Sequence, residues 1–115
     1  MKKIALIAFL MLTSISSAYA GVVKVFDAGL IGTVQAFSTY GTGIVLIKFS
    51  PGVTGCTSGV YIDGSDAGGK EALSVAIAAY MSDKEVTIYG NTDESWSGQQ
   101  PAGTICHLNS IRFGS

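Results

Sequence analysis

Residues 66–90, DAGGKEALSVAIAAYMSDKEVTIYG, predict one helix that runs directly into one strand. Residues 72–81 are mostly strong helix formers. Asp66 or Ser65 is placed to cap this helix, because a side-chain oxygen there can accept from the free amide groups of the first turn. The remaining strands must therefore be arranged around one central helix.

The predicted helix is apolar over most of its circumference. Leu73, Ala76, Ile77 and Tyr80 follow the i, i+3, i+4, i+7 spacing of one buried face. Further apolar residues widen that face beyond what one small domain covers, which predicts either contact with a second subunit or a helix lying deep under a sheet. The predicted interface residues are Leu73, Val75, Ala76, Ala79 and Tyr80.

The strand after the helix, residues 85–89, alternates between apolar and polar side chains. This period of two is typical of a half-buried strand. Val86 and Ile88 are expected to face the core. Thr87 and Tyr89 are expected to face solvent.

The other predicted strands are separated by glycine-rich turns. Glycines within residues 27–32 predict either a turn between two short strands or a bend inside one long first strand. The last strand changes phase, which predicts a β-bulge near residues 109–110. The expected strands are residues 21–39 with that interruption, then 44–49, 59–63, 85–89 and 104–113.

This order, three strands, one helix and two strands, is that of an OB-fold. We therefore expect a mostly β domain, an OB-fold-like five-stranded barrel with its helix between strands 3 and 4. An α+β sandwich built from the same elements is the structural alternative.

The first twenty residues predict a secretory signal peptide. Lys2 and Lys3 precede a short apolar run at residues 4–12, and the AYA sequence at residues 18–20 fits signal peptidase cleavage after Ala20. This run is shorter than the roughly 20 residues of a membrane span, and no later run is long enough. We expect export to the periplasm or the medium, and one OB-fold-like domain over residues 21–115.

Residues 21–115 carry five basic and eight acidic side chains, so their net charge is 5 − 8 = −3. This mildly acidic balance argues against nucleic acid as a partner. Two cysteines in an exported chain predict one disulfide, Cys56–Cys106, worth roughly 4 kcal/mol by loop entropy. Because the lone His107 has no second ligand at metal-site spacing, neither a metal nor another cofactor is expected.

The segment KEALSVAIAAYMSDKEVTIY, residues 70–89, resembles the helix-to-strand segment of AB5 toxin B subunits of the subtilase-cytotoxin and pertussis-like kind. The chain is also similar to small exported gammaproteobacterial proteins of unassigned function. Their shared pattern is matched here by Cys56, Tyr61, Gly69, Lys70, Ala72, Leu73, Lys84, Val86, Cys106, Ile111, Arg112 and Phe113.

The resemblance implies an OB-fold and a role in binding. Such toxin subunits form homopentameric rings that bind cell-surface glycans and have no catalytic activity, while a separate A chain supplies the catalysis. The sialic-acid-binding residues of those subunits have no counterpart in the first strand here, so the resemblance does not carry over a glycan site.

Two loops border the usual ligand face of an OB-fold, residues 38–43 and 91–103. An exposed aromatic ring with polar neighbours suits sugar binding, because the ring stacks on the C–H face of the sugar. The alternative is that Trp96 folds back and completes the core. The predicted ligand-binding residues are Tyr40, Thr42, Asn91, Asp93, Trp96 and Gln99.

Nothing in the sequence predicts catalysis. Asp93 and Glu94 are adjacent and do not indicate the opposed carboxylates of a glycosidase. His107 is expected to face solvent from its strand, beside a cysteine held in a disulfide. The expected function is a secreted, non-enzymatic, homo-oligomeric glycan-binding subunit. The alternative is a stand-alone exported domain that contacts or inhibits another protein.

Overall fold

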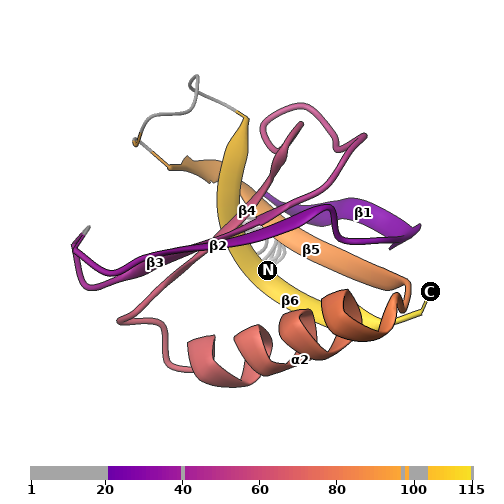
Figure 1. Cartoon of the computed structure of the whole chain (residues 1–115). Coiled ribbons are helices and arrows are strands. Elements are labelled where there is room, and N and C mark those ends of the chain that lie inside the picture. The colour runs from indigo at the N-terminus through magenta and orange to yellow at the C-terminus, as the bar shows by residue number, and fades with distance from the viewer. Residues whose placement is uncertain (1–20, 40, 97, 99–103, 115) are drawn as a thin grey trace, which may run out of the picture.

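The computed structural model describes residues 21–39, 41–96, 98 and 104–114. The predicted signal peptide therefore lies outside the described residues. Six strands and one helix occupy this part of the chain (Figure 1). In order they are β1 (Val22–Gly29), β2 (Thr33–Phe37), β3 (Ile44–Lys48), β4 (Gly59–Asp63), α2 (Gly69–Ser82), β5 (Val86–Ser95) and β6 (Ile105–Phe113).

All six strands belong to one sheet in the order β1-β5-β6-β4-β3-β2. Only β4 and β6 pair in parallel, and the other neighbours are antiparallel. The sheet is not closed by hydrogen bonds. Its two edge strands, β1 and β2, are nevertheless consecutive in the chain and are joined by residues 30–32. The sheet is strongly coiled, and α2 lies across one of its sides (Figure 1).

The prediction of a five-stranded barrel with the helix after strand 3 is wrong in its count, because six strands form and α2 follows β4. The cause lies in the interruption of the first strand. Ala28 has a positive φ of 48°, and the pairing of β1 with β5 shifts between Phe26 and Gly29. β1 continues through Ala28 to Gly29, and residues 30–32 then separate it from β2, so the predicted first strand is divided into two.

The core lies mainly between the sheet and the helix. Phe26 and Phe49 stack with ring centroids 4.4 Å apart, and Ile47, Val60 and Ile88 are fully buried beside them. A smaller cluster lies apart from the helix and contains Ile44, Leu46, Trp96 and Ile105. These clusters fix the sheet on which the site is built.

The start of α2 differs from the predicted cap. Gly68 is the N-cap residue, and no side chain bonds to the amide groups of the first turn. Asp66 accepts instead from the backbone N–H of Asp63, at 2.9 Å. The expectation of a side-chain cap at Asp66 or Ser65 is therefore wrong, because the Asp66 carboxylate is used in the turn before the helix.

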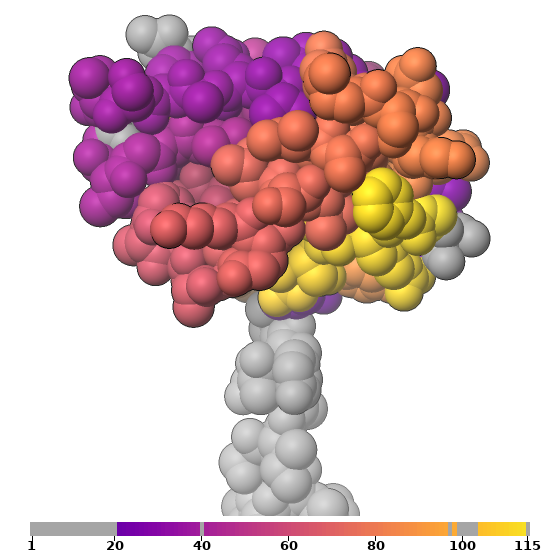
Figure 2. Space-filling model, turned by 60° about the horizontal axis from the view of Figure 1, so that its bottom comes forward, coloured from indigo at the N-terminus to yellow at the C-terminus, as the bar shows by residue number. Residues whose placement is uncertain are grey.

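The helix buries its small residues and exposes several large ones. Ala76 and Ala79 are buried against the sheet of the same domain, while Ile77, Tyr80 and Met81 are exposed. Figure 2 shows α2 across this face, between residues of the first strands and the end of β6. A contact with another subunit through this helix would therefore use Ile77, Tyr80 and Met81, not Ala76 and Ala79 as the sequence suggested.

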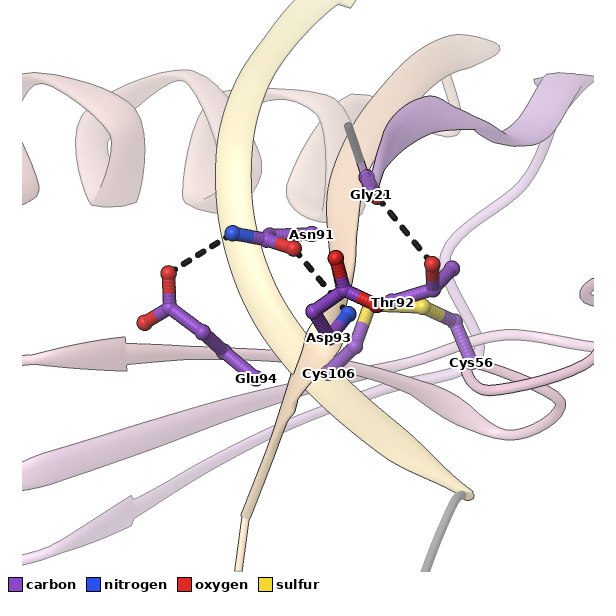
Figure 3. The surroundings of a disulfide bond; sticks show 7 residues. All are labelled: Gly21, Cys56, Asn91, Thr92, Asp93, Glu94 and Cys106. Carbon is purple, nitrogen blue, oxygen red and sulfur yellow. Dashed lines mark hydrogen bonds between the residues drawn. A yellow bond between two sulfur atoms is a disulfide. The ribbon is translucent and has the colours of Figure 1, made fainter. Parts of the chain in front are cut away.

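The phase change predicted for the last strand is confirmed. Tyr89 pairs with Ser110 and Gly90 pairs with Leu108, so Asn109 is the extra residue of a bulge in β6. The Cys56–Cys106 disulfide is also confirmed, and it ties the loop after β3 to β6 (Figure 3). Gly90 lies against this bridge, since a Cβ atom there would be only 2.6 Å from the Sγ of Cys106.

The prediction that Thr87 faces solvent is wrong, because this residue of β5 is fully buried. Its hydroxyl donates to the carbonyl of Gly114 and accepts from the N–H of Ala28 at 3.2 Å. Residue 87 is thus a polar link that joins β1, β5 and the end of the chain.

Replacing Thr87 with Val should lower the free energy of unfolding by about 1–3 kcal/mol, because the isosteric side chain leaves the N–H of Ala28 without its acceptor. Thr87→Ser is the matched control, since it keeps both hydrogen bonds and loses only one methyl group. Urea denaturation of the three proteins measures the difference. A Val variant as stable as the wild type would contradict the assigned link.

Candidate functional site

The turn between β4 and α2 places Asp66 at the base of the helix. The N–H of Asp66 donates to the carbonyl of Asp63 at 2.9 Å, and the carbonyl of Asp66 accepts from Gly69 at 3.1 Å. With the bond from the N–H of Asp63 to its carboxylate, these contacts hold Asp66 in one orientation. Its Oδ2 atom faces β6.

A second carboxylate comes from the irregular end of β5. Asn91 pairs with His107, but the next paired residue is Ser95, so residues 92–94 leave the regular ladder. The side-chain N–H of Asn91 donates to Glu94 at 2.7 Å, and its oxygen accepts from the N–H of Asp93 at 3.0 Å (Figure 3). These bonds direct Glu94 back over the sheet.

His107 in β6 lies between the two carboxylates. Its Nε2 is 2.8 Å from Asp66 Oδ2, and its Nδ1 is 3.1 Å from Glu94 Oε2. The imidazole also stacks on Tyr61, with ring centroids 4.8 Å apart and planes 18° apart. The expectation of a solvent-facing histidine is wrong, because the ring is held on three sides and only 24% of its side-chain surface is exposed.

The electrostatics of this cluster favour the protonated imidazole. Burial alone would lower the pKa of His107, but hydrogen bonds and charge from Asp66 and then Glu94 outweigh it, so the pKa is raised above 6.5. Only the imidazolium can donate from both ring nitrogens at once. Burial, followed by the same two carboxylates, raises the pKa of Tyr61.

A cleft of about 350 Å³ opens beside this cluster. Ile62, Ala72 and Leu108 are the larger apolar residues that line it. Its polar side chains come from the turn before α2, from β5 and from β6. They are Asp66, Asn91, Glu94, His107 and Asn109.

The residues predicted for ligand binding do not gather at one place. Asn91 lines the cleft, whereas Asp93 is exposed next to it and is not among the lining residues. Thr42 lies in the β2–β3 hairpin and donates to Asp63. Tyr40 and Gln99 lie outside the described residues.

Trp96 belongs to the core, with 6% of its surface exposed. Its ring lies 5.7 Å from that of Phe37, and the backbone N–H of Trp96 donates to the carbonyl of Ile105 at 2.9 Å. This placement agrees with the alternative in which the indole completes the core. In this position the ring offers no open face for a sugar.

The comparisons with known proteins give no relative: no family model, no curated protein and no solved structure matches the chain. Among the described residues, no helix is long and apolar enough to cross a membrane. No group of three or more His, Cys, Asp or Glu side chains in that same part of the chain is arranged to hold a metal ion.

The His107 cluster predicts a pH-dependent stability. Because its folded pKa lies above 6.5, the folded state binds this proton more tightly than the unfolded state. The stabilisation is therefore complete below pH 6.5 and is lost as the pH rises through the folded pKa. Its size should be on the order of 1 kcal/mol, since the carboxylates are partly exposed.

Urea denaturation of the wild type and of His107→Gln across this alkaline range tests the assignment. The wild type should lose stability as the pH rises, and the variant should lose less. His107 is the only histidine in the chain, so no other imidazole contributes. Equal slopes for the two proteins would contradict the assigned bridge.

Proposed function

We propose that this chain is an exported, non-enzymatic binding domain that recognises a cell-surface glycan in the cleft beside His107. The observation that carries the proposal is the convergence of five polar side chains from three segments on one cleft that Ile62, Ala72 and Leu108 also line. Amides and carboxylates supply both the donors and the acceptors that a ring of hydroxyl groups requires.

The hydrogen bonding of His107 supports binding over catalysis. A general base needs a free ring nitrogen within reach of the proton that it removes. Here Nε2 and Nδ1 both face carboxylates, at 2.8 and 3.1 Å. The imidazole thus acts as a fixed cationic bridge that orients Asp66 and Glu94.

The strand order supports the interpretation of the domain as OB-fold-like. If β1 and β2 are counted as one divided first strand, five strands remain and α2 falls between the third and the fourth. That first strand would then pair with the second on one side and with the fourth on the other. This is the connectivity of the partly open five-stranded barrel.

The exposed face of α2 supports assembly. Ile77, Tyr80 and Met81 expose between 42% and 76% of their surfaces on one helix. As in the toxin B subunits that the sequence resembles, we propose a homopentameric ring, with any catalytic A chain as a separate partner. The same exposed face also favours the second candidate, a stand-alone exported domain that binds or inhibits another protein.

A glycan array with the purified protein tests the ligand class. Asn91→Ala should weaken binding about tenfold, because each lost hydrogen bond of about 1.4 kcal/mol corresponds to one decade of affinity. Lys84→Ala is the control, since Lys84 is exposed just beyond the far end of α2. Binding unchanged in Asn91→Ala, or no glycan bound by the wild type, would reject the cleft as a glycan site.

Native mass spectrometry separates the two candidate functions. A closed ring should dissociate in Met81→Lys, because a charge would be buried at the contact, and should persist in Lys84→Ala. A wild type that is monomeric at all concentrations would exclude the ring. It would leave the stand-alone domain as the better candidate.

A further inference from the structure

A second cavity lies on the other side of Asp66, between the β2–β3 hairpin and the first turns of α2. Its volume is about 430 Å³, within the roughly 300–1,000 Å³ of small-molecule sites. It shares Ile62, Asp66 and Gly69 with the polar cleft, so the two spaces are neighbours.

The walls of this cavity are mainly apolar. Phe37 from β2, Ile44 and Val45 from β3, Ile62 from β4 and Leu73 from α2 line it. The β2–β3 hairpin extends past the start of the helix (Figure 1), and residues of both line the cavity. Glycine and alanine residues in the intervening turns lack the side chains that would fill it.

One end of the cavity is acidic. The carboxylates of Asp63, Asp66 and Glu71 line it, and Lys70 is the one basic side chain among the lining residues of this described region. A hydrogen bond from the Thr42 hydroxyl, followed by one from the N–H of Ser65, lowers the pKa of Asp63. Both hydrogen bonds of the Asp66 carboxylate, to the N–H of Asp63 and to His107, use Oδ2, so its Oδ1 can accept from a ligand.

We propose that this cavity binds a small molecule with an apolar aliphatic or aromatic body and a primary ammonium head group. The body fills the apolar walls, and the ammonium group faces Asp63, Asp66 and Glu71. Three carboxylates face Lys70 and, through Asp66, the His107 imidazolium, so this end has a net charge of −3 + 2 = −1, which attracts a cation and repels an organic acid of the same shape. The proposal does not depend on the glycan proposal, which concerns the polar cleft.

Binding should be visible at His107. A ligand ammonium near Asp66 adds a positive charge beside the imidazolium and shares its carboxylate, so the pKa of His107 should fall on binding. The other groups that face His107 are Tyr61, Glu94 and, at longer range, Asp63. Because the chain has one histidine, a single imidazole proton resonance reports the change.

The experiment is an NMR and calorimetric titration of the purified protein with three probes of nearly equal shape: phenethylamine, 2-phenylethanol and 3-phenylpropionate. Saturable binding is expected for the amine, with the alcohol at least about tenfold weaker and the acid weaker still. The amine alone should lower the pKa of His107. An acid that binds as tightly as the amine, or no saturable binding of any probe, would overturn the proposal.

Two variants locate the site. Val45→Phe should abolish amine binding by filling the cavity. Glu71→Gln should weaken it several-fold, whereas Glu85→Gln, which removes an exposed carboxylate before β5, should not. Amine binding unchanged in both Val45→Phe and Glu71→Gln would also overturn the proposal. A change of oligomeric mass in Val45→Phe without a change in amine affinity would show that a second copy occupies the cavity, and would reject the ligand.

Discussion

The parallel pairing of β4 with β6 is the constraint on which the rest of this structure depends. Two parallel neighbours cannot be joined by a tight turn, so the chain must cross over between them, and α2 and β5 make that connection. The disulfide reinforces the pairing, because Cys106 lies opposite Val60 and is bonded to Cys56 in the loop before β4. The next pair in register, Tyr61 and His107, begins the site.

The site follows from this pairing because its groups come from elements that the crossover brings together. Asp66 lies where the chain leaves β4 for the helix, and Glu94 lies where β5 leaves the ladder with β6. His107 links the two through its ring nitrogens. One protonated imidazole thus connects the start of the crossover to its end, and its charge offsets two carboxylates that would otherwise repel each other.

Several elements of the fold could be predicted from the sequence because each depends on residues close together in the chain or on a simple count. The helix, the strand after it, the β6 bulge and the disulfide all depend on spacing within a short segment or on a count of two cysteines. The division of the first strand was left open, since glycine permits both a bend and a turn. The structure divides it at residues 30–32, just after the register shift beside Ala28, whose φ is positive.

The site could not be predicted in the same way because its contacts are not local. The carboxylate partners of His107 are 13 and 41 residues away in the chain, and no spacing rule joins them. Thr87 was assigned to solvent by the alternation of β5, yet its acceptor is at residue 114. Trp96 stands in a polar loop of the sequence, but the partner of its ring is Phe37 on β2.

Asp66 lines both the cleft beside His107 and the second cavity, so its two carboxylate oxygens are shared between them. Its Oδ2 is committed to the turn and to His107, which leaves Oδ1 as the only oxygen able to accept without breaking the bridge. A cation that approaches Asp66 weakens the hold on His107, and loss of the His107 proton leaves Asp66 and Glu94 as unshielded negative charges. If the proposed ammonium ligand binds, its occupancy and the protonation of His107 are coupled through this one carboxylate, and by linkage the coupling acts equally in both directions.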